Sequence, residues 1–225
     1  MNSRDAAAQE HGEEGRATAG KITLDPESMP TLRLYKLVTG TVVPRPIGFV
    51  STLGPTGVPN VAPFSFFNAV SHRPPIVLFS SAVRDGRDKD TIANVRATGE
   101  FVINIVTEAI AQQMSACAEN YPPGTSEFAV TGLTPMAATV VKPPMVAESP
   151  VNMECTLLQL LPLPDSEYTV VLGRVVLFHV SPDLFGEEGR IDSARLRAIG
   201  RMAGNTYVLT RELFAMRYDS FTQIT

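Results

Sequence analysis

Residues 151–180 read VNMECTLLQLLPLPDSEYTVVLGRVVLFHV and contain two long β-prone segments. In the first, Val151–Leu157, apolar and polar residues alternate, which predicts a strand with one buried face and one polar face. The second, Tyr168–Val180, is apolar on both faces for much of its length. Because only the short link Pro162–Ser166 separates them, we expect the two strands to pair in antiparallel order.

Shorter strands are predicted upstream of this pair. Ile47–Leu53 and Val58–Phe64 flank the turn sequence Gly54–Gly57, and together the three segments predict a hairpin. Further strands are expected at Ile76–Ser80 and Phe101–Val106.

Helical patterns are few and short. They are expected at Met29–Val38, Lys89–Thr98 and Glu108–Cys117. Gly40 is placed to end the first helix, and Gly99 to end the second. Asp88 or Asp90 can cap the start of the second helix.

Many short strands, two long strands late in the chain and few helices indicate a mainly β protein, built as a barrel or a sandwich. Strands do not alternate with helices, and neither GxGxxG after a strand nor GxxxxGK[ST] occurs, so a Rossmann sheet is not expected. Residues 1–23 are expected to form a mobile tail, because the first 20 residues hold no large apolar side chain after Met1. Residues 24–225 are expected to form a single domain.

Composition restricts the class of protein further. The 225 residues are 44% hydrophobic and carry a net charge of −4, so a nucleic-acid partner, which usually requires a basic patch, is not expected. Cys117 and Cys155 form no CxxC motif and are predicted to be two buried thiols in a reducing compartment. No apolar run approaches the roughly 20 residues that span a bilayer, and the N-terminus does not resemble a signal peptide. We therefore expect a soluble, cytoplasmic protein with no membrane partner.

A charged segment, Arg84–Thr91, leads into the second predicted helix. The backbone N–H groups at a helix start favour an anion, and Lys89 and Thr91 add a positive charge and a hydroxyl donor. The segment could therefore hold a phosphate monoester, or it could simply be a capped helix on a charged surface.

Two other local patterns have a structural and a functional interpretation. Hydroxyls at strand ends, Ser51-Thr52 and Ser80-Ser81, could bind the polar edge of a ligand or satisfy loop backbone groups. The aromatic residues of Phe64–Phe67 could wall a flat ligand, or they could form core or a subunit interface. No histidine pair has metal-ligand spacing, and no GxSxG marks a hydrolase.

The order of several short segments resembles one known family, the flavin reductase-like, FMN-binding split-barrel proteins. The segments are PRPIGFVSTL at 44–53, NVAPFSFFNAVS at 60–71, PPIVLFS at 74–80, KDT at 89–91, TGEFVIN at 98–104, ESP at 148–150, GRVV at 173–176, GR at 200–201 and GNTY at 204–207. The resemblance runs from about Leu32 to Tyr207. Phe49 stands where many members have Trp.

The resemblance implies a Greek-key split β-barrel with a few peripheral helices, a homodimer, and FMN bound near the subunit interface. Phe49, Val50, Ser51 and Thr52 would run along the flavin, and Ala62, Pro63, Phe64 and Ser65 would flank its ring and ribityl chain. Ser80, Lys89 and Thr91 would hold the phosphate, and Arg201 and Asn205 would also reach the ligand.

The resemblance also implies an activity: hydride transfer from NADH or NADPH to N5 of FMN, with no catalytic residue required from the protein. Such an NAD(P)H:flavin oxidoreductase could supply reduced flavin to a partner monooxygenase. Two alternatives stay open at this point. The chain could be an FMN-bound electron carrier or ferric reductase, or it could be a non-enzymatic split-barrel module.

Overall fold

The structure is a computed structural model that describes residues 16–18, 20–83, 86–122 and 124–216. It divides the chain into two units, residues 1–42 and residues 43–225. Most of the predicted N-terminal tail lies outside the described residues, as do Arg84 and Asp85 of the charged segment.

The first unit contains a short strand pair and one helix. Strands β1 (Arg16–Thr18) and β2 (Lys21–Thr23) pair antiparallel, and the 3-10 turn η1 (Pro26–Ser28) follows them. Helix α1 (Thr31–Thr41) confirms the first predicted helix but continues through Gly40. It ends at Thr41 because Pro44 lies three residues further on and cannot donate a backbone hydrogen bond.

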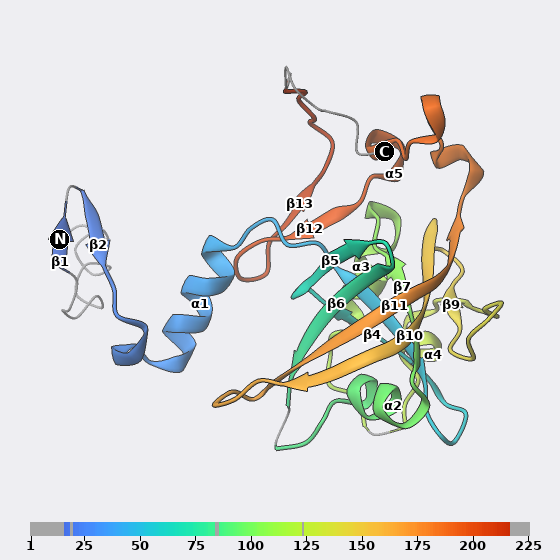
Figure 1. The fold of residues 1–225 in the computed structure, drawn as a ribbon, viewed down its shortest axis with the longest axis horizontal. Coiled ribbons are helices and arrows are strands. Elements are labelled where there is room, and N and C mark those ends of the chain that lie inside the picture. Colours follow the sequence, from blue (N-terminus) through green and yellow to red (C-terminus); the bar gives the residue numbers. More distant parts are fainter. Residues whose placement is uncertain (1–15, 19, 84–85, 123, 217–225) are drawn as a thin grey trace. The chain divides into compact units, whose positions relative to one another are not determined.

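The second unit is built on a seven-stranded antiparallel sheet, in the order β4-β3-β7-β10-β11-β6-β5 (Figure 1). Its strands are β3 (Gly48–Leu53), β4 (Pro59–Phe64), β5 (Phe67–His72), β6 (Pro75–Ala82), β7 (Glu100–Ile105), β10 (Val151–Pro162) and β11 (Tyr168–Val180). The sheet curls, since the ring of Phe64 in β4 packs against the ring of Phe79 in β6 in a tilted arrangement, with centroids 4.8 Å apart. A mainly β fold is therefore confirmed.

The predicted strands are present, and one strand of the seven-stranded sheet, β5, was not expected. The β3–β4 hairpin closes through the predicted turn, in which Gly57 N–H donates to Gly54 C=O at 2.9 Å and Gly57 has φ +81°. The long strands β10 and β11 pair antiparallel from Val151–Val180 onward. Strand β5 lies where the sequence indicated only an aromatic cluster.

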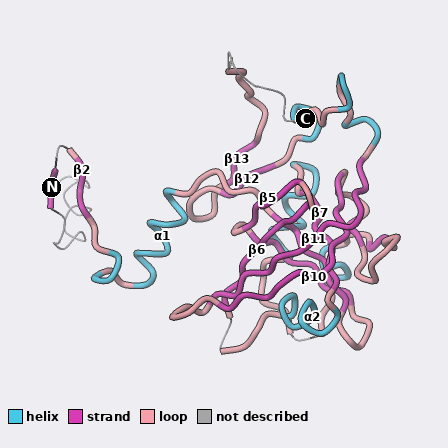
Figure 2. Tube along the Cα trace, viewed as in Figure 1, coloured by secondary structure: helices cyan, strands magenta, loops and turns pink. Residues whose placement is uncertain are grey.

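Short helices, 3-10 turns and short strands surround the sheet (Figure 2). They are α2 (Asp90–Thr98), η2 (Glu108–Ile110), α3 (Ala111–Ala116), α4 (Glu127–Thr131), β8 (Pro135–Met136), β9 (Met145–Val146), η3 (Pro182–Leu184), η4 (Glu187–Gly189), α5 (Ser193–Leu196), β12 (Ile199–Arg201) and β13 (Tyr207–Leu209). The helix predicted at 108–117 is thus a 3-10 turn followed by a short α-helix. Helix α2 ends as predicted at Gly99, which has φ +69°.

One sequence-based expectation was wrong. Neither aspartate caps α2, because Asp88 forms an ion pair with Arg96 at 2.9 Å and Lys89 occupies the N-cap position. The predicted polar face of β10 is itself buried: Asn152 and Glu154 are 2% and 0% exposed. Glu154 is covered because it accepts hydrogen bonds from the distant backbone at 139–141.

The core lies on both faces of β3. On one face Val50 joins a cluster inside the curled sheet, which includes Phe79 and Phe101. On the other face Phe49 packs with Met114 and Phe128 of the covering helices. Because both of its faces are buried, β3 is held firmly in the core, and its pairing with β4 fixes the position of that strand.

Gly173 is required by this core packing. A Cβ at this position would lie 2.9 Å from Cε1 of Phe101 and closer still to Cζ. Since Phe101 is fully buried, Gly173→Ala should lower the free energy of unfolding by about 1–3 kcal/mol. Urea unfolding followed by circular dichroism measures the loss. In a Phe101→Leu background, Gly173→Ala should cause a smaller loss of unfolding free energy than it does in the wild type. An equal loss in both backgrounds would contradict the steric explanation.

Candidate functional site

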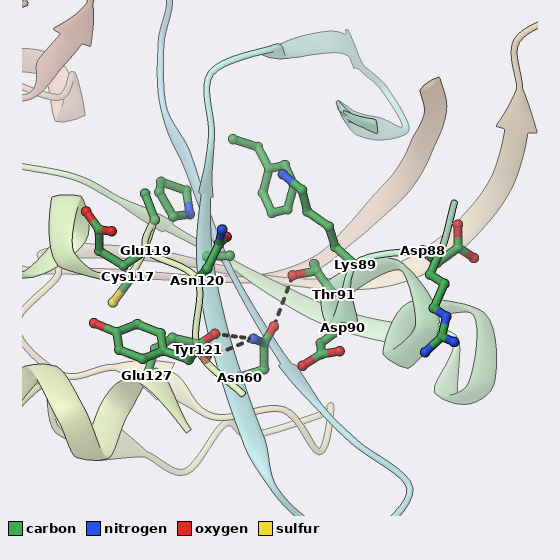
Figure 3. Close-up of a pocket in the computed structure, with 15 residues that line it drawn as sticks. Asn60, Asp88, Lys89, Asp90, Thr91, Cys117, Glu119, Asn120, Tyr121 and Glu127 are labelled. Carbon is green, nitrogen blue, oxygen red and sulfur yellow. Dashed lines mark hydrogen bonds between the residues drawn. The ribbon is translucent and has the colours of Figure 1, made fainter. Parts of the chain in front are cut away.

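A pocket of about 540 Å³ opens where β4, the start of α2, the loop at 117–121 and the start of α4 meet (Figure 3). Its lining residues are Asn60, Ala62, Pro63, Phe64, Arg87, Asp88, Lys89, Asp90, Thr91, Cys117, Ala118, Glu119, Asn120, Tyr121 and Glu127. Polar groups from four separate elements therefore converge on one cavity, as is common in ligand sites.

One wall of the pocket is the outer edge of β4, the terminal strand of the sheet. Pro63 is tolerated there because an edge strand does not need every N–H for pairing. Val61 N–H points away from the sheet and donates to Glu127 Oε2 at 3.0 Å. In an antiparallel strand the backbone groups of alternate residues share one direction, so C=O groups of Val61 and Pro63 face outward and can meet a ligand.

The opposite wall is the start of α2. The first N–H groups of a helix have no partner within it. The side chain at the N-cap position makes no capping hydrogen bond to them. Lys89 lies at the N-cap position with its Nζ 5.7 Å from the centroid of the Phe64 ring. Backbone amides, helix dipole and ammonium group together favour an anion at this wall.

The floor of the pocket is a buried hydrogen-bond network centred on Asn60 (Figure 3). Asn60 Nδ2 donates to both carboxylate oxygens of Glu127, at 2.8 Å each. Asn60 Oδ1 accepts from Thr91 Oγ1 at 3.0 Å and from Thr52 Oγ1 at 3.2 Å. Asn94 Nδ2 donates in turn to Thr52 Oγ1 at 3.0 Å. The network joins the β3–β4 hairpin, α2 and α4 around the cavity.

Two ionisable groups of the pocket have shifted pKa values. Burial raises the pKa of Glu127, and nearby Asp90 acts in the same direction, whereas hydrogen bonds from Val61 and Asn60 act against it. Burial raises the pKa of the Cys117 thiol to about 11, so this thiol is protonated at neutral pH and is not an activated nucleophile. Cys117 and Cys155 are both buried and free, as predicted.

Five of the residues that the sequence assigned to flavin binding line this pocket: Ala62, Pro63, Phe64, Lys89 and Thr91. The Thr91 hydroxyl is directed to Asn60, so Thr91 can meet a ligand through its backbone N–H rather than its side chain. Phe49 and Val50 are core residues on opposite faces of β3.

The remaining assigned residues lie outside the pocket lining. Ser51 is fully buried, with its hydroxyl donating to Pro144 C=O and accepting from Asn104 Nδ2. Thr52 takes part in the buried network, and Ser80 lies in β6, paired with Val170.

Three assigned residues lie just after β4 or in the β12–β13 hairpin: Ser65, Arg201 and Asn205. Ser65 Oγ accepts from Arg45 Nε at 3.5 Å, and Arg45 pairs through its backbone with Arg201. The Arg201 guanidinium packs over the Tyr207 ring, 4.6 Å from its centroid, and hydrogen-bonds the Tyr207 hydroxyl. Asn205 is exposed at the tip of the β12–β13 hairpin.

Sequence reasoning missed several lining residues. Asn60 stood within a recognised segment without a role, and Glu127 and the loop at 117–121 carried no pattern that pointed to a site. Their role depends on contacts between distant segments: Glu127 is 67 positions from Asn60.

Other classes of site receive no support from the described part of the chain. It contains no group of three or more His, Cys, Asp or Glu side chains that could hold a metal ion. Among its helices, none is both long and apolar enough to cross a membrane.

Comparison with known proteins gives consistent results. A family model described as "Flavin reductase like domain" matches residues 39–195. An uncharacterised protein of Aquifex aeolicus is 43% identical over 176 residues, which is 78% of this chain and 89% of its own. The crystal structure of nitrilotriacetate monooxygenase component B from Bacillus cereus is 36% identical, with a TM-score of 0.85 over 88% of this chain and 100% of the other.

A third protein bears on the fold alone. A chain with a split barrel domain from Shewanella frigidimarina is 22% identical, with a TM-score of 0.76 over 86% of this chain and 96% of its own. The split barrel expected from the sequence is thereby confirmed. Because the family model matches well over half of its length, the chain belongs to the flavin reductase-like domain family.

Proposed function

We propose that this protein is an NAD(P)H-dependent flavin reductase that binds FMN with its phosphate at the start of α2. The observation that carries the proposal is the start of α2, where the N-cap residue is Lys89 and its side chain makes no capping hydrogen bond. This helix start opens onto a cavity bordered by the edge of β4. A phosphate monoester fits this wall by charge and by hydrogen-bond donors.

Each wall of the pocket has its own role. Lys89 and the N–H groups of Asp90 and Thr91 hold the phosphate. The edge residues Ala62, Pro63, Phe64 and Ser65 flank the ribityl chain and the ring. Ser80, Arg201 and Asn205 reach the ligand from outside the pocket lining. The buried strand Phe49–Thr52 does not contact the ligand and supports β4, with which it pairs.

Bound FMN supplies the two-electron redox chemistry, with NADH or NADPH as the donor. The protein contributes binding, orientation and backbone dipoles rather than an acid or a base. The protonated Cys117 thiol agrees with that assignment, because it offers no competing nucleophile.

We further propose that the protein is a homodimer and supplies reduced flavin to a separate monooxygenase. The similarity to a monooxygenase component B supports the second point. Several apolar side chains on β10 and β11 are exposed, including Leu158, Val176 and Phe178. Burial of these side chains against a second copy of the chain would remove them from water, which supports the dimer. Light scattering should give twice the chain mass.

Steady-state assays test the activity. We expect the protein to oxidise NADH or NADPH with FMN as acceptor, with a lower KM for FMN than for riboflavin, which lacks the phosphate. Tight FMN binding without oxidation of either donor would instead assign an electron carrier. A protein that binds no flavin and oxidises neither donor would refute the proposal.

A further inference from the structure

The Glu127 carboxylate is the one acceptor-only group in the buried network of Thr52, Asn60, Thr91, Asn94 and Glu127. Hydroxyls and amides can both donate and accept, whereas an ionised carboxylate can only accept. The Asn60 amide must therefore turn its Nδ2 toward Glu127. This nitrogen donates to both carboxylate oxygens of Glu127, at 2.8 Å each. Val61 N–H, at 3.0 Å from Oε2, fixes the carboxylate itself.

The orientation of Asn60 has a direct effect on α2. With Nδ2 facing Glu127, Oδ1 faces the other way and accepts from Thr91 Oγ1 at 3.0 Å. Thr91 belongs to the first turn of α2 and is 1% exposed. The hydrogen bond to Asn60 thus holds the first turn against β4, next to Lys89.

Burying the Glu127 carboxylate costs free energy, and the packing around Glu127 does not require a charged group. Glu127 is 8% exposed, and in the described part of the chain its carboxylate accepts from neutral N–H donors, those of Asn60 and Val61. The negatively charged Asp90 lies near enough to disfavour the ionised form of Glu127. Removing a charge from water without a cationic partner is unfavourable. A glutamine would fill the same volume at lower cost, but it would not determine which way Asn60 turns.

We propose that Glu127 is a positioning residue for the flavin phosphate: by orienting Asn60 it fixes Thr91, and with it the α2 amides and Lys89. The inference rests on the proposed function, because it assumes that FMN binds with its phosphate at this wall. Glu127 acts through Asn60 and Thr91 and does not touch the ligand.

The test compares the affinities of the purified protein for FMN and for riboflavin, measured by quenching of flavin fluorescence. Glu127→Gln should weaken FMN binding about ten-fold, a coupling of ordinary size, and should change riboflavin binding less than about two-fold. The control Glu100→Gln alters a carboxylate that accepts Lys142 N–H at 3.0 Å and is not among the pocket-lining residues, so it should leave both affinities unchanged.

A double-variant cycle separates positioning from general stability. In a Thr91→Val background the hydrogen bond from Thr91 to Asn60 is already lost, so adding Glu127→Gln should cause little further loss of FMN affinity. Should Glu127→Gln fail to fold, Thr91→Val and Thr91→Ser test the same link. Thr91→Val should lose the preference for FMN over riboflavin, and Thr91→Ser, which keeps the hydroxyl, should retain it.

Each outcome decides a separate question. An equal loss of FMN and riboflavin affinity in Glu127→Gln, or no loss of either, would overturn the role of Glu127 while leaving the proposed function in place. Full additivity of the Glu127 and Thr91 variants would overturn the route through Asn60. A wild-type protein that binds neither flavin would refute the proposed function, and this inference with it.

Discussion

Replacing Glu154 by alanine should lower the free energy of unfolding by about 3–5 kcal/mol, because several hydrogen-bond donors lose their buried acceptor at about 1–3 kcal/mol each. Glu154 is fully buried on β10. It accepts hydrogen bonds from the N–H groups of Thr139, Val140 and Val141 at 2.6–2.8 Å, and it pairs with His179 Nε2 at 2.6 Å. The variant leaves these donors buried without an acceptor, and each unsatisfied donor is costly.

Urea unfolding followed by far-UV circular dichroism measures this loss. A matched control is Glu148→Ala, since the exposed Glu148 carboxylate also accepts a backbone N–H, that of Thr134 at 2.9 Å. The control should stay within about 0.5 kcal/mol of the wild type, as surface substitutions usually do. Equal losses in the two variants would contradict the role assigned to Glu154.

The same carboxylate predicts a pH dependence. Burial alone would raise the pKa of Glu154, but hydrogen bonds from His179 and from the amides of residues 139–141 outweigh burial and lower it from 4.5 to about 2. Because the folded-state pKa is lowered, the stabilisation is complete above about pH 4.5 and is lost as the pH falls from 4.5 toward 2. This shift corresponds to about 3 kcal/mol. Wild-type stability should therefore fall more steeply over that range than the stability of Glu154→Gln, and parallel curves would contradict the assignment.

Replacing Lys89 by alanine should weaken FMN binding by about 1.5–3 kcal/mol, the usual contribution of a charge-assisted hydrogen bond, which is roughly 10-fold to 150-fold in Kd. Riboflavin affinity should change little, because riboflavin has no phosphate to contact the ammonium group. The FMN affinity of the wild type should also fall with added salt, and that dependence should be weaker in the variant.

Flavin fluorescence titration measures both affinities. Lys142→Ala is the matched control, because Lys142 is an exposed lysine outside the pocket lining. It should bind both flavins as the wild type does. An unchanged FMN affinity in Lys89→Ala would remove Lys89 from the phosphate site.

Local patterns predicted most of the sheet. Alternation in Val151–Leu157 and the turn at Gly54–Gly57 depend on neighbours in sequence, so the β10–β11 and β3–β4 pairs followed from them. The prediction that the α2 start favours an anion also came from local chemistry, because helix polarity and Lys89 are both features of one short segment.

Features that depend on distant segments could not be predicted in this way. Burial of Glu154 requires the backbone at 139–141 to cover β10, and the Asn60–Glu127 contact joins β4 to α4. Asp88 was predicted to cap α2, but it forms an ion pair with Arg96, which lies further along the helix. The sequence alone did not indicate that this ion pair would form instead of the cap. Strand β5 was missed because the aromatic residues around its start, Phe66 and Phe67, predict core or interface as readily as a strand.

The visible absorption spectrum of the purified protein, recorded without oxygen before and after addition of NADH or NADPH, tests the central claim most directly. The proposed function predicts a flavin spectrum, present on purification or after addition of FMN, that bleaches with at least one of the two donors. A flavin spectrum that persists with both donors would contradict the reductase activity. A colourless protein that takes up no added FMN would contradict the flavin site itself.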